Sequence, residues 1–328
     1  MSADFLILRN EYLSVEICPT QGADIRKVAR AGRSENLLLE TKWEGSEANY
    51  CTCESNDEDH FLSHYAGGWQ LMIPNAGFPS VSKYGAVGYH GEAWSNSWCI
   101  IRQDDDQLVM ETTLKSAPIK IQRIVSLNFQ TLEVTDIVTN ISDTETALIW
   151  GHHPAFSNLL IDSSTEVQIY ASVIGIKNIS HIETTNNSPR ILDQHSEYFV
   201  LKDFMKSPQS FLGFASEFKN GLASIMNKNN QLCVNLSWDS TIFPHAWVWI
   251  ENKNILEKPW EKNIVTLAIE PCTSKNNMGI EESKREPNNV LILEGNTSKS
   301  ATICLEVLNL PTSPEDIGLS TLKGGYSL

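Results

Sequence analysis

Polar and apolar residues alternate with a period of two through most of this 328-residue chain. In the segment 119–129 the odd-numbered positions are mostly apolar and the even-numbered positions between them are mostly polar, and the segment 232–238 repeats the pattern. Such alternation is typical of strands that bury one face. Runs rich in β-branched or aromatic residues, at 246–250, 290–293 and 302–308, predict further strands. Helical spacing is short and ambiguous even in the best segment, 197–204, so we predict an all-β fold with few short helices.

Polar turns separate the predicted strands, and no feature of the sequence divides the chain. Asn10, Gly22 and the Asn-Asn-Ser-Pro segment at 186–189 are typical turn sequences. The chain contains no internal repeat, low-complexity tract or Pro/Gly/Ser-rich linker. Length alone would allow two domains. The simplest prediction is one domain over residues 1–328.

The charge balance restricts the partners of the protein. The chain has 25 Lys and Arg against 40 Asp and Glu, a net charge of −15, which argues against binding nucleic-acid phosphates. Its first residues lack the basic start and long apolar run of a secretory signal, and no apolar stretch approaches the roughly 18 residues of a membrane helix. Seven cysteines without regular spacing suit a reducing compartment. We therefore expect a cytoplasmic protein with no nucleic-acid or membrane partner.

Three segments are richer in glycine, aromatic and titratable residues than ordinary connections. The first, 67–98, contains Gly-Gly-Trp-Gln at 67–70, Pro-Asn-Ala-Gly at 74–77 and His-Gly-Glu at 90–92. Glycine permits close backbone approaches, and tryptophan rings offer flat surfaces on which sugar rings pack. A packed aromatic loop that binds nothing would have the same composition, so this segment alone leaves both interpretations open.

The other two segments carry acid–base candidates. On an extended backbone the adjacent His152 and His153 point to opposite faces of a sheet, so at most one faces a given site. A lone histidine is more often a packed structural residue than a catalyst. In the third segment, 266–272, Glu270 ends an apolar strand. Burial would raise the pKa of Glu270 toward the range of a general base, but a solvated strand end is the favoured interpretation of this residue taken alone.

Taken together and in order, these motifs resemble the aldose 1-epimerase family, which includes the galactose mutarotases. The resemblance rests on Gly-Gly-Trp-Gln, Pro-Asn-Ala-Gly, His-Gly-Glu, His-Pro-x-Phe and Ile-Glu-Pro. It extends to the start of the chain through the segments 8–15, 22–25 and 36–39, and so covers nearly the whole sequence. It implies a large antiparallel β-sandwich, the galactose mutarotase-like supersandwich.

The resemblance also implies a reaction, the interconversion of the α and β anomers of a free aldose without a cofactor. One group takes the proton of the C1 hydroxyl and another gives a proton to the ring oxygen. The family's base falls on Glu270, and its acid falls on His153, three residues before Phe156. A second, supporting histidine falls on His90. A carboxylate can accept and return the hydroxyl proton, and an imidazole titrates near neutral pH.

Candidates for substrate binding follow from the same resemblance and from side-chain chemistry. Amides both donate and accept hydrogen bonds. The residues are Asn75, Gln70, Glu92, His152 and Trp249. Within this set His152 is expected to orient its neighbour or to pack on the other face of the strand.

Two departures from the family pattern concern the sugar. The family's arginine near Asn75 is absent from this segment, and Glu92 or Lys83 is offered in its place. The family's sugar-binding aspartate has no clear match, Asp239 being the residue considered. The identity of the sugar therefore stays open.

Three other interpretations remain. A phosphosugar mutarotase would need a cationic cluster, whereas the first segment contains only Lys83. A non-catalytic carbohydrate-binding or sensor protein could use the same fold, although binding alone requires no acid and base. The array Cys51, Cys53, His60 and His64 has side chains that zinc accepts, but the stretch reads equally well as an acidic loop. We expect no metal, a sugar as the partner, and a monomer or homodimer.

Overall fold

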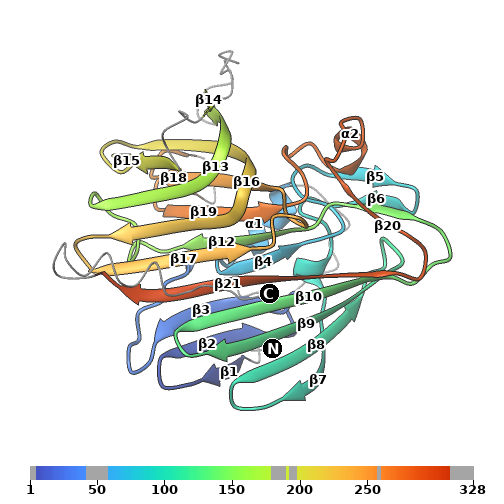
Figure 1. The fold of residues 1–328 in the computed structure, drawn as a ribbon, viewed down its shortest axis with the longest axis horizontal. Coiled ribbons are helices and arrows are strands. Elements are labelled where there is room, and N and C mark those ends of the chain that lie inside the picture. The colour runs from blue at the N-terminus through green and yellow to red at the C-terminus, as the bar shows by residue number, and fades with distance from the viewer. Residues whose placement is uncertain (1–4, 42–57, 179–189, 192–197, 257–259, 311–328) are drawn as a thin grey trace.

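The computed structural model describes residues 5–41, 58–178, 190–191, 198–256 and 260–310 (Figure 1). Within them 17 strands form one continuous hydrogen-bonded sheet whose strand pairings are antiparallel, and the sheet folds over into two layers. The predicted antiparallel β-sandwich with few short helices is thereby confirmed. No helix among these residues is long and apolar enough to span a membrane.

The first layer carries the candidate catalytic residues. Its strands, in hydrogen-bonded order, are β1 (Leu6–Arg9), β2 (Leu13–Cys18), β3 (Asp24–Arg30), β4 (Trp69–Met72), β12 (Gly151–Phe156), β19 (Val265–Cys272) and β18 (His245–Asn252). The second layer runs through β7 (Cys99–Gln103), β8 (Gln107–Thr113), β9 (Ile119–Asn128), β10 (Thr131–Asn140), β21 (Ser298–Asn309) and β17 (Leu232–Trp238).

A long strand, β16 (Gln209–Asn227), joins the two layers. Its first half pairs with β18 and its second half with β17. Its other edge pairs with β13 (Thr165–Asn178), which also pairs with β14 (Arg190–Ile191) and β15 (Phe199–Lys202). The remaining elements are β5 (Ser80–Ser82), β6 (Gly85–Val87), β11 (Thr146–Leu148), β20 (Leu291–Leu293), α1 (Glu58–His64), α2 (Ile280–Ser283) and the 3₁₀ turn η1 (Ala93–Ser95).

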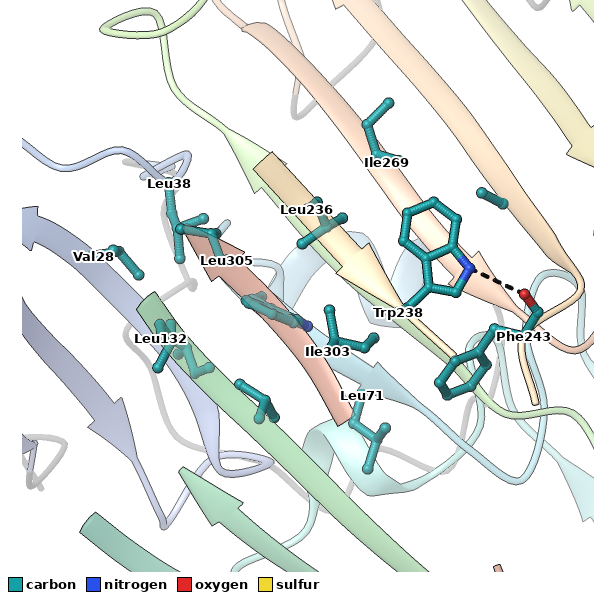
Figure 2. Packing of buried hydrophobic residues seen from close by; sticks show 14 of the residues in the cluster. Val28, Leu38, Leu71, Leu132, Leu236, Trp238, Phe243, Ile269, Ile303 and Leu305 are labelled. Carbon is teal, nitrogen blue, oxygen red and sulfur yellow. Dashed lines mark hydrogen bonds between the residues drawn. The ribbon is translucent and has the colours of Figure 1, made fainter. Parts of the chain in front are cut away.

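The main core lies between the layers (Figure 2). Leu71 and Ile269 of the first layer belong to the same buried cluster as Leu132, Leu236 and Ile303 of the second. Full burial of an aliphatic side chain of this size contributes about 1.5–3 kcal/mol. The alternation that predicted β9 arises here, because its odd-numbered residues are buried in this core and its even-numbered residues are less buried.

The central strands of the first layer, in contrast, are buried on both faces. Every residue of β12 is buried, and so is nearly every residue of β19. Their second face packs against two smaller apolar clusters, one that includes Trp249, Ala268 and Phe61 and one that includes Met72 and Trp247. The side chain of Glu270 lies on this second face.

Several local predictions can be compared with the structure. The strand predicted at 232–238 is β17, and the one predicted at 119–129 is β9 without its last residue. The ambiguous helical segment contains the strand β15 instead. Asn10 caps its turn through its side-chain oxygen, which accepts hydrogen bonds from the backbone N–H groups of Tyr12 and Leu13.

Candidate active site

One row of side chains crosses the first layer on its second face. The β18–β19 register pairs Trp247 with Glu270, and the β12–β4 register pairs His153 with Gln70. The β12–β19 pairing, with Gly151 opposite Cys272 and Ala155 opposite Ala268, places His153 level with Glu270. Neighbouring strands lie about 4.8 Å apart, so these four strands bring residues distant in sequence into contact.

Glu270 and His153 form the centre of the row. Nε2 of His153 lies 3.6 Å from Oε1 of Glu270, and their side chains are only 7% and 2% exposed. Burial raises the pKa of Glu270 to about 8 and lowers the pKa of His153 to about 4. Oε2 of Glu270 and Nδ1 of His153 have no hydrogen-bond partner among the residues that the structure describes. A buried acid–base pair of this kind is typical of a functional site.

His90 lies beside this pair, with its ring centroid 5.6 Å from that of His153. The backbone N–H of Gly77 donates a hydrogen bond to Nδ1 of His90 at 3.1 Å. Burial holds the pKa of His90 well below its usual value, so the ring is neutral and carries its proton on Nε2. The tight turn depends on Gly91, where a Cβ would lie 2.4 Å from the carbonyl oxygen of Ile73. His90 is therefore a fixed, uncharged hydrogen-bond donor.

Aromatic side chains surround the three titratable groups. The ring of Tyr65, which follows α1, is 5.7 Å from that of His153, and the ring of Trp249 is also 5.7 Å from it. Phe61 of α1 contacts His90 at 4.8 Å. Burial and the nearby charge of Glu270 hold the pKa of Tyr65 well above its usual value. These rings exclude water from the row and thereby account for the shifted pKa values.

His152 belongs to the other face of β12, as its place next to His153 predicts. Its Nδ1 accepts a hydrogen bond from the indole N–H of Trp69 at 3.1 Å, and its Nε2 lies 3.2 Å from Oδ2 of Asp136. Asp136 is also held by two 2.8 Å hydrogen bonds from Arg123 in the core. Both nitrogens of His152 are thus occupied inside the sandwich. The structure thus places His152 on the face opposite Glu270, and its role in binding substrate stays a prediction.

Asn75 and Glu92 use their side chains to hold loops. The amide of Asn75 donates to the carbonyls of Phe78 and Gly88 and accepts from the N–H of Ile280. The carboxylate of Glu92 accepts hydrogen bonds from the backbone N–H groups at 115 and 116. Both side chains therefore hold loops of the site in place, and their role in binding substrate stays a prediction.

The two replacements considered from the sequence lie elsewhere. Lys83 donates to Thr144 and to the carbonyl of Glu145 on the exposed surface. Asp239 caps a turn by accepting two hydrogen bonds from Thr241. The structure instead places Asp24 and Arg26 of β3 beside Gln70.

Sequence reasoning did not select Asp24, Arg26 or Tyr65 as site residues. Asp24 lies in the segment 22–25, which contributed to the resemblance. Asp24 and Arg26 are two residues apart on β3 and so share one face of the strand, and this alternation of charged residues could have pointed to them.

Metal-ligand residues do not gather in the described part of the chain. No group of three or more His, Cys, Asp or Glu side chains there could hold a metal ion. Of the four residues considered for zinc, His60 and His64 lie on α1, with ring centroids 4.7 Å apart. Cys51 and Cys53 lie outside the described residues, so the zinc hypothesis stays untested.

Two surface grooves of about 370 and 380 Å³ are lined by residues near the β1–β2 and β9–β10 turns. They share Tyr12 and Gln130. Neither groove contains a histidine or a residue of the row. The row is therefore the better candidate for chemistry.

The fold is shared with other solved structures. Structures with the same fold include a galactose mutarotase related enzyme from Lactobacillus acidophilus, 15% identical with a TM-score of 0.64 over 94% of this chain and 99% of that one. An aldose epimerase homologue from C. elegans is 11% identical, with a TM-score of 0.65 over 94% and 99%. The Slr1438 protein from Synechocystis sp. PCC 6803 is 14% identical, with a TM-score of 0.68 over 94% and 98%. The chain has the galactose mutarotase-like β-sandwich fold.

A sequence-family model defines the chain more closely. Residues 1–307 match the family described as a domain of unknown function, DUF4432, and the chain belongs to that family. No curated protein matches it in sequence.

Proposed function

We propose that this protein is a mutarotase, an isomerase that interconverts the α and β anomers of a free aldose by acid–base catalysis. The observation that carries the proposal is the buried pair formed by Glu270 and His153 on neighbouring strands. The hydroxyl oxygen on C1 and the ring oxygen are bonded to the same carbon. An acid and a base that serve both atoms must therefore lie side by side.

The chemistry of each step follows from this placement. Glu270 takes the proton of the C1 hydroxyl as the bond between C1 and the ring oxygen breaks, and His153 gives a proton to that oxygen. The open-chain aldehyde rotates about the C1–C2 bond, and the two transfers then run in reverse on the other face. His90, neutral with its proton on Nε2, stabilises the oxygen that gains negative charge. Each well-placed acid or base contributes roughly 10²–10⁴-fold.

Proton counting supports the assignment. With pKa values of about 8 for Glu270 and about 4 for His153, the pair holds one exchangeable proton between these limits. The ionised Glu270 with protonated His153 contains the same number of protons as the neutral pair. The pair can therefore supply one base and one acid without exchanging a proton with solvent.

The charges on the row favour a neutral sugar over a phosphosugar. At the β3–β4 end of the row, the described charged side chains are Asp24 and Arg26, whose Oδ2 and Nε lie 3.8 Å apart. A phosphate would need several cations. The proposal includes the remaining expectations, namely one cytoplasmic domain, monomeric or homodimeric, that acts without cofactor or metal.

The test is anomerisation of freshly dissolved α-glucose, α-galactose and other aldoses, followed by polarimetry or proton NMR. We expect the wild-type protein to accelerate anomerisation of at least one sugar, and Glu270→Gln and His153→Ala to lose that acceleration while sugar binding persists. Binding without acceleration by folded wild-type protein would instead support the non-catalytic sensor.

A further inference from the structure

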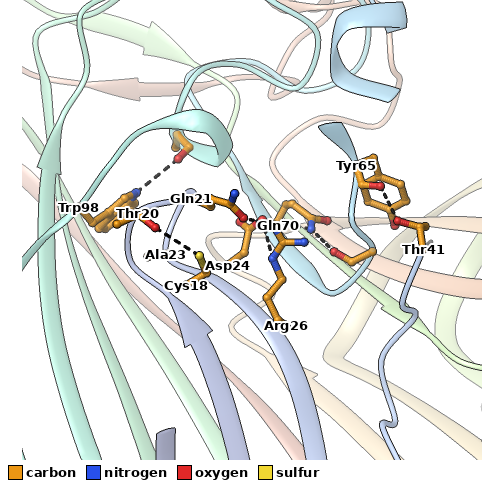
Figure 3. A network of polar contacts seen from close by, with 12 residues as sticks. Cys18, Thr20, Gln21, Ala23, Asp24, Arg26, Thr41, Tyr65, Gln70 and Trp98 are labelled. Carbon is orange, nitrogen blue, oxygen red and sulfur yellow. Dashed lines mark hydrogen bonds and ion pairs between the residues drawn. The ribbon is translucent and has the colours of Figure 1, made fainter. Parts of the chain in front are cut away.

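We propose that Asp24, Gln70 and Arg26 form a second subsite that binds a vicinal pair of sugar hydroxyls on the side of the ring away from C1. This proposal rests on the proposed mutarotase function and adds to it the residues that select the substrate. The three side chains lie together at the β3–β4 end of the catalytic row (Figure 3).

The subsite continues the row without a break. The pairing of Ile25 with Trp69 places Asp24 level with Gln70, which in turn is opposite His153. Strand spacing puts Gln70 about 4.8 Å from His153 across the sheet and Asp24 about twice as far. A sugar with C1 at the Glu270–His153 pair therefore extends its remaining hydroxyls toward Gln70 and Asp24.

Hydrogen-bonding capacity in the subsite is unused. Asp24 and Gln70 are each only 3% exposed. Within the described parts of the chain, Oδ1 of Asp24, Oε1 of Gln70 and Nε of Arg26 have no hydrogen-bond partner. Buried polar atoms are almost always paired, so three unpaired atoms from one cluster indicate a polar ligand.

Existing contacts fix the orientation of these groups. The Gln70 amide nitrogen donates to Oδ2 of Asp24 at 3.3 Å and to the carbonyl of Gly67. Because the amide nitrogen of Gln70 already donates to two acceptors, the amide orientation is fixed and its oxygen Oε1 is the unused acceptor. Arg26 is held by Gln21, which accepts a 2.6 Å hydrogen bond from its guanidinium. At Gly22 a Cβ would lie 2.7 Å from Oδ1 of Asp24, so the absence of a side chain there keeps this oxygen free of a steric contact.

The polar atoms match hydroxyl groups and not an anion. Oδ1 of Asp24 and Oε1 of Gln70 both accept hydrogen bonds, which two neighbouring hydroxyls can donate. Nε of Arg26, 3.8 Å from Oδ2 of Asp24, can donate to one of the same hydroxyl oxygens. An acidic substituent would instead face the carboxylate of Asp24. The subsite therefore selects neutral aldoses with hydroxyls on two adjacent carbons.

A double-mutant cycle tests this proposal: the protein loses the carboxylate of Asp24, and the sugar loses one hydroxyl. The substrates are glucose or galactose, whichever the wild-type protein anomerises faster, and its 3-deoxy and 4-deoxy analogues; the variant is Asp24→Asn. We expect Asp24→Asn and removal of the recognised hydroxyl each to lower kcat/KM by roughly 10- to 100-fold. Both changes together should cost little more than either one, because each removes the same hydrogen bond. Independent, multiplicative losses for both analogues would overturn the proposal.

The control variant is Asp104→Asn. Asp104 forms an ion pair with Arg102, also two residues away on the chain, but this pair is more than half exposed. Asp104→Asn should leave kcat/KM and the discrimination against deoxy sugars unchanged. Circular dichroism and thermal unfolding establish that Asp24→Asn is folded, and Gln70→Met provides a second variant that removes the amide but keeps the size of the side chain. We expect Gln70→Met to raise KM more than it lowers kcat.

Equilibrium binding separates this proposal from the proposed function. Saturation-transfer NMR with the same sugars measures binding without catalysis. A wild-type protein that binds the parent sugar without anomerising it, and that loses binding on Asp24→Asn, would contradict the mutarotase and support the subsite. An Asp24→Asn protein that binds and turns over every sugar like the wild type would overturn the subsite and leave the mutarotase standing. Absence of both binding and turnover would overturn both.

Discussion

The two faces of strand β12 hold adjacent buried histidines in opposite states. On the inner face both ring nitrogens of His152 have partners, and the bonded group continues through Asp136 to Arg123. On the outer face Nδ1 of His153 and Oε2 of Glu270 find no partner among the described residues. The difference shows that burial alone does not identify a functional histidine. A functional histidine is indicated by burial together with a ring nitrogen that has no hydrogen-bond partner.

Electrostatics separate the two faces in the same way. Burial alone would raise the pKa of Asp136, but the guanidinium of Arg123 and the N–H of His152 hold it well below the usual range. Glu270 has no such compensation, and burial raises its pKa to about 8. The inner carboxylate is therefore fixed as an anion, whereas the outer one can gain and lose a proton near neutral pH.

The largest effect expected is the loss of catalysis in Glu270→Gln. The amide cannot take a proton, so acceleration of anomerisation should fall by about 10²–10⁴-fold, whereas the free energy of unfolding at pH 7 should be higher than that of the wild type. Polarimetry and chemical denaturation measure the two quantities. The matched control is Glu251→Gln, another buried glutamate, whose carboxylate already accepts hydrogen bonds from the N–H groups of Asn254 and Ile255. Equal losses of rate in both variants would contradict the assignment of the base.

On the inner face, Asp136→Ala should affect stability most. It leaves the guanidinium of Arg123, which is fully buried, without its anion. Breaking a buried pair in this way costs about 3–5 kcal/mol of unfolding free energy. Urea denaturation provides the measurement. A loss below about 1 kcal/mol would mean that the inner group does not stabilise the fold.

The pH dependence of stability should distinguish the faces next. The folded pKa of Glu270, about 8, lies above its unfolded value, so its stabilising contribution is complete below about pH 4.5 and is lost as pH rises toward 8. Relative to wild type, Glu270→Gln should gain unfolding free energy over that window, by at most about 1.4 kcal/mol per pH unit. Parallel stability curves for the two proteins would show that Glu270 is not buried as described.

The rate of anomerisation should depend on how many protons the Glu270–His153 pair holds. We expect kcat/KM to be highest between about pH 4 and about pH 8, because the pair loses its exchangeable proton above the pKa of Glu270 and gains a second one below that of His153. Among the other titratable side chains near the pair, Tyr65 and Tyr89 stay neutral in this range, and burial holds the pKa of His90 well below its usual value. Burial raises the pKa of Asp24, at the far end of the row, to about 7, so Asp24 titrates within the range. A rate that rises steadily past pH 9 would contradict this expectation.

The smallest effect is predicted for Glu92→Gln. This change weakens the hydrogen bonds that Glu92 accepts from the loop at 115–116 and should cost about 1 kcal/mol of unfolding free energy. KM for the sugar should stay within about twofold of wild type. A large rise in KM would support Glu92 as a substrate-binding residue.

Local periodicity predicted much of this fold because β9 and β17 bury one face and leave the other half exposed. The same reasoning is weaker for β12 and β19, which are buried on both faces and so show no alternation. The helix α1 is only seven residues long, too short for helical spacing to be recognised.

In the site, motif resemblance selected Glu270, His153 and His90, and the structure brings these three together. Side-chain type could not reveal that the amide of Asn75 is fully engaged by backbone groups, because one of those groups, the N–H of Ile280, is 205 residues away. The position of Asp24 depended on the register between β3 and β4, which no local pattern encodes.

Because β12 is paired along both edges and buried on both faces, its amide hydrogens should exchange with solvent only when the whole protein unfolds. The backbone N–H of Ala155, for example, donates to the carbonyl of Gly68 in the interior. His153, which transfers a proton in each proposed reaction cycle, would thus lie on one of the segments whose backbone amides exchange most slowly with deuterium. The rate of proton transfer at the His153 side chain and the rate of amide exchange along β12 would differ by many orders of magnitude, although the two groups lie only a few ångströms apart.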